Sequence, residues 1–250
     1  MLKIVKMRSK IDLSPNYSKK TRKLKDIKFV IIHYTGMQSE IASIKRLKDP
    51  KKKVSSHYLI NRKGVITKMV DDRKIAWHAG KSRWKNFVNL NSFSIGIELV
   101  NKGHKFGYQK FSSIQITSLI NLCKNLKKKY KIKKENFLGH SDIAPLRKVD
   151  PGEKFPWQKL SKYNLGLWYK KDDKNIKTRE IEKRTIFFKN IYKIGYRYFS
   201  LKEKISNKEK KIIKAFQLKF LPKNVSGKLD QKTVKISYYL ASGHKILKKP

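Results

Sequence analysis

The sequence predicts an α/β fold in which a mixed central β-sheet is flanked by helices, followed by a small all-α three-helix bundle. Strand-like and helix-like patterns alternate across residues 27–157, which is typical of an α/β domain. After Trp157 the strand-like patterns stop and three helical patterns follow. The 250 residues, 39% of them hydrophobic, are enough to bury a sizeable core.

The first half of the chain predicts an arm and then most of the sheet. Residues 1–26 are polar and charged, so we expect an arm laid over the surface. Residues 27–33 are almost wholly apolar and rich in β-branched side chains, which predicts a strand buried on both faces. The elements expected next are a helix at 38–47, a hairpin made of 55–61 and 65–70, an extended piece at 75–78 and a central strand at 93–101.

A long helix is predicted from Ser112 to about Tyr130, because apolar residues recur there at steps of three and four. Ser112 with Gln115 three residues later suggests a capping box at its start. The single cysteine, Cys123, lies on the apolar stripe of this helix and is expected to be a buried thiol. One cysteine also excludes an intramolecular disulfide.

The remaining elements complete the predicted domain organisation. A short strand at 137–140 precedes a segment, 141–157, that contains three prolines and is expected to be an ordered loop. Helices are predicted at 179–194, 207–221 and 230–240. We therefore expect an N-terminal arm at 1–26, an α/β domain at 27–161, a linker at 162–177 and a helical domain at 178–250.

The charge balance is strongly basic and indicates an attraction to polyanions. The 63 Lys and Arg residues outnumber the 18 Asp and Glu residues, which gives a net charge of +45. Only ten of the basic residues are Arg, although direct recognition of bases favours Arg, so we expect no specific nucleic-acid partner. A non-catalytic polyanion-binding protein, for nucleic acid or cell wall, is the alternative function that the charge suggests.

The sequence contains no run of about 18 apolar residues, so no transmembrane segment is predicted. Residues 1–10 carry four basic side chains and have neither the apolar core of a secretory signal nor a lipid-attachment Cys. As the sequence stands, it predicts a cytoplasmic protein. A misassigned start site would instead place the protein in the cell envelope or periplasm.

Three potential metal ligands fall at strand ends or in the ordered loop: His33, His140 and Asp150. Two imidazoles and one carboxylate, with a fourth position left for water, make up the ligand set of a hydrolytic zinc site. Spacing alone leaves open that these histidines are ordinary core or surface groups. His104 and His244 lie in polar surroundings and are expected to be solvated.

Two charged residues are candidates for catalytic roles beside such a site. Glu98 lies in the middle of an apolar strand, where it is either a buried carboxylate paired with Lys or a backbone amide, or a general base. Lys148 lies two residues before Asp150 and is expected to project to the same side. Lys148 is then either part of a surface ion pair or a donor to a developing oxyanion. Asp142 is expected to be a turn or helix cap.

Several motifs taken together carry a resemblance to a known family. They are Ser14-Pro15-Asn16-Tyr17, residues 30–35, residues 54–60, Trp77-His78-Ala79-Gly80, residues 94–99 and the segment from His140 to Trp157. Over roughly residues 14–160 the chain resembles the zinc-dependent N-acetylmuramoyl-L-alanine amidases of the second amidase family, which are relatives of the peptidoglycan recognition proteins. In the helical domain at 178–250, the stretches Ile194-Gly195-Tyr196, 215–220 and 227–233 resemble the peptidoglycan-binding-like domain found behind the cell-envelope amidases of this family.

The resemblance implies a role for each candidate residue. His33, His140 and Asp150 would bind one Zn²⁺ per chain, Glu98 would act as general base and Lys148 would stabilise the tetrahedral intermediate. Ser56 stands where some family members have a Tyr, which leaves the base role to Glu98. The loop residue Trp77 is expected to contact substrate, and His78 either contacts substrate from the same loop or has a structural role. His57 is expected to orient a metal ligand.

The function implied is hydrolysis of the amide bond between N-acetylmuramic acid, or its 1,6-anhydro form, and L-alanine. The expected partners are peptidoglycan or muropeptide fragments, in cell-wall turnover or recycling. The protein is expected to be a monomer. The sequence leaves open whether intact wall or soluble anhydro-muropeptide is the substrate.

Overall fold

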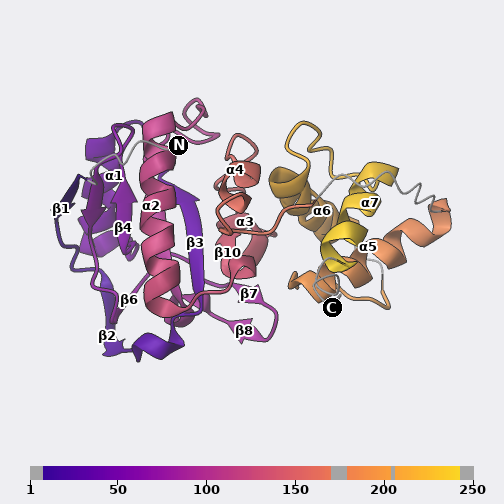
Figure 1. Ribbon diagram of the computed structural model, residues 1–250, viewed down its shortest axis with the longest axis horizontal. Helices are drawn as coiled ribbons and strands as arrows, with labels where there is room; N and C mark the ends of the chain where they lie inside the picture. Colours follow the sequence, from indigo (N-terminus) through magenta and orange to yellow (C-terminus); the bar gives the residue numbers. More distant parts are fainter. Residues whose placement is uncertain (1–7, 170–178, 204–205, 243–250) are drawn as a thin grey trace.

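The computed structural model describes residues 8–169, 179–203 and 206–242. Residues 1–7 of the expected arm, residues 170–177 of the expected linker and His244 lie outside these residues. The main sheet has six strands in the order β1-β5-β4-β9-β3-β10 (Figure 1). Only β4 and β5 pair antiparallel and the other four neighbouring pairs are parallel, so the predicted mixed sheet is confirmed.

The strands and helices have the following bounds. The strands are β1 (Ser9–Ile11), β2 (Tyr17–Thr21), β3 (Phe29–Tyr34), β4 (Tyr58–Ile60), β5 (Ile66–Lys68), β6 (Lys74–Ala76), β7 (Arg83–Trp84), β8 (Phe87–Val88), β9 (Ser94–Leu99) and β10 (Phe137–Gly139). The helices are α1 (Glu40–Lys48), α2 (Ser113–Tyr130), α3 (His140–Ile143), α4 (Trp157–Ser161), α5 (Glu180–Ile194), α6 (Ser206–Phe220) and α7 (Gln231–Ser242).

Some predicted elements differ from the structure in detail. The expected arm contributes two strands, since β1 pairs with β5 and β2 pairs with β6. The Ser112 side chain caps α2 by accepting the Gln115 backbone N–H, but no capping box forms. The Gln115 side chain donates instead to the carbonyls of Ile60 and Val100. The segment expected to be a loop after the last strand begins with the short helix α3.

The two faces of the sheet are covered differently. Side chains alternate along β3 and β9, so Val30 and Ile32 face one side while Phe29, Ile31 and His33 face the other. Helix α2 covers the first side and buries Cys123 there, as predicted (Figure 1). The opposite side of the sheet therefore carries His33.

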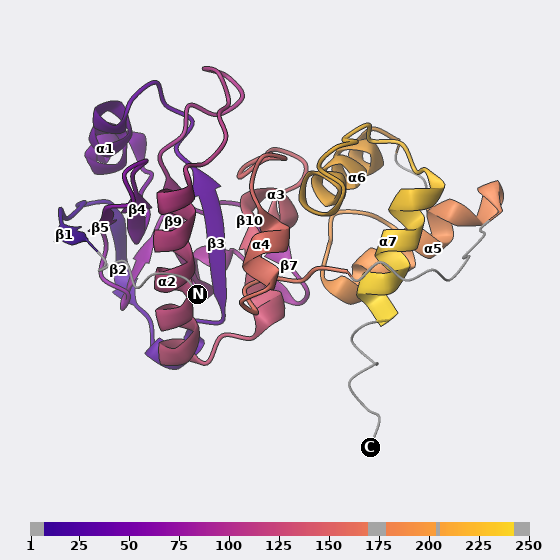
Figure 2. The same ribbon diagram turned by 45° about the horizontal axis from the view of Figure 1, so that its top comes forward.

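The three C-terminal helices lie beyond β10 (Figure 2). They share a hydrophobic core with the α/β part, because one cluster of buried side chains includes residues of both. Its members include Phe29, Ile31, Trp84, Leu138, Ile143, Phe187, Phe188, Ile191, Tyr196, Phe216 and Phe220. Within the described ranges, no helix is long and apolar enough to cross a membrane.

Candidate metal centre

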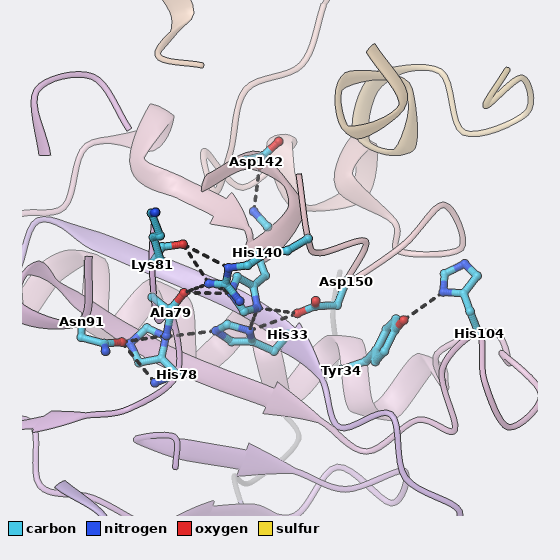
Figure 3. Close-up of polar contacts among 12 residues, drawn as sticks. His33, Tyr34, His78, Ala79, Lys81, Asn91, His104, His140, Asp142 and Asp150 are labelled. Carbon is cyan, nitrogen blue, oxygen red and sulfur yellow. Dashed lines mark hydrogen bonds and ion pairs between the residues drawn. The ribbon is translucent and has the colours of Figure 1, made fainter. Parts of the chain in front are cut away.

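His33, His140 and Asp150 meet at the carboxyl ends of two parallel strands. His33 is the fifth residue of β3, His140 directly follows the neighbouring strand β10, and Asp150 comes from the loop after α3. His33 Nδ1 lies 3.0 Å from His140 Nδ1, and Asp150 Oδ2 lies 3.1 Å from each of these nitrogens (Figure 3). All three residues are buried.

Hydrogen bonds behind His33 fix the position of its ring proton. The Ser94 hydroxyl donates to the Leu90 carbonyl at 2.6 Å, so its oxygen accepts from His78 Nε2 at 3.2 Å. His78 Nδ1 is then an acceptor and receives the proton on His33 Nε2 at 3.0 Å. The lone pair of His33 Nδ1 is left pointing toward Asp150.

His140 is held in the same tautomer by a different partner. Its Nε2 lies 3.1 Å from the Ala79 carbonyl, which only accepts, so the proton is on Nε2. The Arg147 guanidinium contacts the same carbonyl and lies 3.4 Å from His140 Nε2. The lone pair of His140 Nδ1 consequently points toward Asp150 as well.

Three electron pairs thus converge on one point with no donor among them, an arrangement that calls for a cation. A tetrahedral zinc ion with bonds of about 2.0 Å has neighbouring ligands about 3.3 Å apart. The three separations of 3.0, 3.1 and 3.1 Å are close to one face of such a tetrahedron. His33, His140 and Asp150 are the only group of three such ligand atoms in the described part of the chain.

The protonation of the triad follows from its burial and its mutual contacts. Burial and, to a smaller extent, the neighbouring His140 lower the pKa of His33 to about 4, against an opposing effect of Asp150. Burial alone would raise the pKa of Asp150, but the adjacent His140 and His33 hold it well below its ordinary value. Neutral imidazoles and an ionised carboxylate are the forms that bind a divalent metal.

Glu98 lies next to His33 on the same side of the sheet. The two residues are directly paired in the register of β3 and β9. The Glu98 side chain is almost fully buried, and its Oε2 has no hydrogen-bond partner among the described residues. Burial and, to a smaller extent, Asp150 raise the pKa of Glu98 to about 8, against an opposing effect of Lys148. An unpaired buried carboxyl of this kind indicates a group that acts on water or substrate.

Lys148 is half-buried, and its charge acts on both Glu98 and His33. It lowers the pKa of Glu98 and of His33. The backbone N–H of Lys148 donates to the Ala144 carbonyl at 3.1 Å, which fixes the chain between α3 and Asp150. Lys148 therefore supplies a positive charge at the edge of the triad.

The structure also places the three remaining candidates, His78, His57 and Trp77. His78 is 6% exposed and lies behind His33, where it contacts the ligand and not open space. His57 contacts no ligand atom among the described residues: its Nδ1 accepts from the Gly96 N–H, and its Nε2 lies 2.8 Å from the Arg22 guanidinium. Trp77 is half-buried and its backbone is hydrogen-bonded to Ser55.

His104 is exposed, as its polar surroundings predicted, and it also has partners that the sequence did not indicate. His104 Nδ1 lies 2.9 Å from the Tyr34 hydroxyl and Nε2 lies 3.0 Å from Glu153 (Figure 3). His104 also stacks on Tyr108. Its side chain is 40% exposed, so polar sequence surroundings correctly indicated exposure but not these partners.

Two contributors to the site, Ser94 and Gly96, belong to one of the motifs of the resemblance, but the sequence gave no sign of the roles they have in the structure. Ser94 ends the hydrogen-bonded row behind His33, and Gly96 provides the space for it. A β-carbon at Gly96 would lie 2.4 Å from the His78 ring. Only the absence of a side chain at that position lets His78 reach His33.

Comparisons with known proteins agree with this geometry. A family model described as N-acetylmuramoyl-L-alanine amidase matches residues 23–153. The chain is 36% identical over 226 residues to N-acetylmuramoyl-L-alanine amidase AmiD of Escherichia coli, covering 84% of this chain and 81% of that protein. It is 35% identical over 164 residues to 1,6-anhydro-N-acetylmuramyl-L-alanine amidase AmpD of Haemophilus influenzae, covering 58% and 86%.

Two solved structures resemble this one over nearly their whole length. The complex of E. coli AmiD with anhydro-N-acetylmuramic acid-L-Ala-D-γ-Glu-L-Lys superposes with a TM-score of 0.77 at 31% identity, covering 92% of this chain and 93% of that chain. AmpDh3 of Pseudomonas aeruginosa in complex with an anhydromuramic pentapeptide superposes with a TM-score of 0.76 at 31% identity, covering 92% and 97%.

Proposed function

Because the chain belongs to the family of N-acetylmuramoyl-L-alanine amidases, we propose that His33, His140 and Asp150 bind the zinc ion of this enzyme and that Glu98 and Lys148 are its catalytic residues. The reaction is hydrolysis of the amide bond between N-acetylmuramic acid, or its 1,6-anhydro form, and L-alanine. The observation that carries the assignment is the convergence of two Nδ1 lone pairs and a carboxylate on one point, beside a buried Glu98.

A zinc ion held by this triad would polarise the scissile carbonyl and lower the pKa of a bound water. Glu98 takes a proton from the attacking water and then delivers it to the departing amine of L-alanine. Burial raises the pKa of this carboxyl above its ordinary value, which brings it closer to the pH at which it must both accept and release a proton. Lys148 places its charge beside the oxygen that becomes negative in the tetrahedral intermediate.

The residues behind the ligands have a positioning role in this scheme. We propose that His78 orients His33 in place of the substrate contact predicted from the sequence, because its ring lies between His33 and Ser94. His57 lies farther from the triad and would act by accepting the backbone N–H of Gly96, the residue that faces the His78 ring. Trp77 remains a predicted substrate contact.

Soluble 1,6-anhydro-muropeptides are the substrates that we propose first. Two similar proteins, AmiD and AmpDh3, have structures in complex with such ligands. The predicted division into a catalytic unit at 27–161 and a helical unit at 178–250 also remains a proposal, as do the monomeric state and the cytoplasmic location. The alternative suggested by charge, a non-catalytic polyanion-binding protein, leaves the convergent triad and the buried Glu98 without a purpose.

The decisive experiment is to change Glu98 alone. The variant Glu98→Gln should lower turnover of an anhydro-muropeptide at least about 100-fold, because general-base catalysis contributes that much. Zinc, measured by elemental analysis, should stay at one ion per chain, whereas His140→Ala should lose both zinc and activity. Mass spectrometry of the released peptide gives the rate.

A matched control is Glu135→Gln, because Glu135 lies at the opposite end of β10 from His140. This variant should retain the wild-type rate. Near-normal turnover by Glu98→Gln would refute its assignment as general base. A wild-type protein that binds no zinc, and whose turnover is unaffected by a chelator, would refute the metal site.

A further inference from the structure

Asp142 occupies an unusual position, two residues after the ligand His140 and completely buried. Its Oδ2 accepts the backbone N–H of Gly139 at 2.8 Å, the residue immediately before His140 (Figure 3). Asp142 therefore caps α3 and fixes the backbone from which the His140 side chain extends. This agrees with the prediction of a helix cap at this position.

The other hydrogen bonds of Asp142 come from the C-terminal helical part. The Lys219 ammonium of α6 lies 2.7 Å from Oδ2, and the Tyr196 hydroxyl, which follows α5, donates to Oδ1. Lys219 is 4% exposed and Tyr196 is fully buried. Lys219 also lies over the Trp157 ring, 4.0 Å from its centre. An ammonium from the last third of the chain thus enters the α/β part and ends beside a ligand-bearing helix.

The C-terminal part also contacts the segment that orients the His140 ring. That ring is held by the Ala79 carbonyl, and a few residues later Trp84 packs edge-on against Tyr196, with ring centres 4.9 Å apart. The Lys85 N–H donates to the Gly195 carbonyl at 2.9 Å. Gly195 is required for this approach, since a β-carbon there would lie 2.4 Å from the Trp84 ring.

A buried ion pair is a poor source of stability, because removing both charges from water costs about as much as their attraction returns. Such a pair is better suited to fixing one geometry. From these contacts we propose that Tyr196 and Lys219 are positioning residues for the metal ligand His140, acting through Asp142, so that the C-terminal helices are a working part of the metal centre. The inference rests on the proposed function, since it assumes the triad as the metal site.

The test compares zinc affinity in five forms of the full-length protein: the wild type, three single variants and one double variant. Lys219→Met leaves Asp142 without its cation, and Tyr196→Phe removes one hydroxyl while retaining the ring against Trp84. The control is Arg184→Met, which breaks a partly buried ion pair of these helices, with Glu209 at 2.6 Å. Zinc dissociation constants are measured by competition with a chelator, and the visible spectrum of the Co²⁺-loaded protein reports the ligand geometry.

We expect Lys219→Met to weaken zinc binding at least about tenfold and to change the Co²⁺ spectrum, as loss of a partner behind a ligand does. Tyr196→Phe should weaken it in the same direction, whereas Arg184→Met should lower only the Tm. The double variant Asp142→Asn, Lys219→Met should recover part of the affinity, because the uncompensated charge is gone.

Unchanged zinc affinity and an unchanged spectrum in both Lys219→Met and Tyr196→Phe would overturn the inference, whatever happens to the Tm. If Lys219→Met does not fold, Tyr196→Phe alone decides between the two outcomes. Absence of zinc binding in the wild-type protein would instead contradict the proposed function, so the two failures are distinguishable.

Discussion

At the scale of single residues, three buried histidines have pKa values well below the ordinary value for histidine. Burial and the nearby Arg22 charge lower the pKa of His57 to about 3, and burial lowers that of His33 to about 4. The pKa of His78 also lies well below its ordinary value, for the same first reason. All three imidazoles are therefore neutral at pH 7 in the absence of a metal.

This arrangement predicts that the metal-free protein loses stability in acid. Each imidazole with a lowered pKa takes up a proton on unfolding below about pH 6.5. Its contribution to the free energy of unfolding is therefore complete above that pH and is lost as the pH falls toward its pKa in the folded protein. The free energy of unfolding should fall by about 1.4 kcal/mol per pH unit for each such group. Urea titrations in chelator between pH 7 and pH 4.5 measure this slope. In His57→Gln the slope should correspond to about one proton fewer taken up on unfolding. An unchanged slope would show that the pKa of His57 is not lowered in the folded protein.

The proposed metal ligands were easier to predict than the residues that support them. His33, His140 and Asp150 stand in local motifs that identify them, and Glu98 is conspicuous as a carboxylate within an apolar strand. The role of His78 was not accessible, because it depends on a ring lying over Gly96, a residue far from it in the chain. Contacts of this kind depend on strand register, which residue identities do not specify.

At the scale of elements, the apolar runs predicted β3, β9 and the hairpin of β4 and β5 to within a few residues. Helix α3 was missed because four residues between a strand and a proline-rich loop carry no helical periodicity. Only one half of the predicted capping box forms, the bond from the Gln115 N–H to the Ser112 hydroxyl. The Gln115 side chain donates instead to two buried carbonyls. Short elements and side-chain partners are set by tertiary contacts.

The close approach of β9 to His78 yields a prediction for this strand. Gly96→Ala should lower the free energy of unfolding by about 1–3 kcal/mol, because a methyl group has no space against the His78 ring. Denaturant titration of Gly96→Ala, His78→Ala and the double variant measures the coupling between them. The double variant should be more stable than the sum of the single effects predicts, and strict additivity would show that the clash is not the cause.

At the scale of the whole molecule, a continuous core joins the sheet to the C-terminal helices. The sequence correctly predicted an α/β part followed by helices, but the change in composition after Trp157 gave no sign of this shared core. The net charge of +45 is likewise a property of the whole surface and does not identify the site.

The shared core predicts that both parts unfold together. Ile191→Ala, a fully buried change in α5, should lower the free energy of unfolding by about 2–5 kcal/mol and leave one transition. Hydrogen exchange should report the same loss of protection in β3 and in α7. The control Ile181→Ala lies on the same helix, where the side chain is 86% exposed, and should change little. Two separate transitions would contradict a shared core.

The link between Lys219 and Asp142 also has a consequence for the order of events in synthesis. His33, His140 and Asp150 leave the ribosome well before α6 does, so a nascent chain carries the triad before it carries the Lys219 ammonium. On the proposal above, firm zinc binding would then require the completed polypeptide, and a product that ends before α6 should bind zinc weakly.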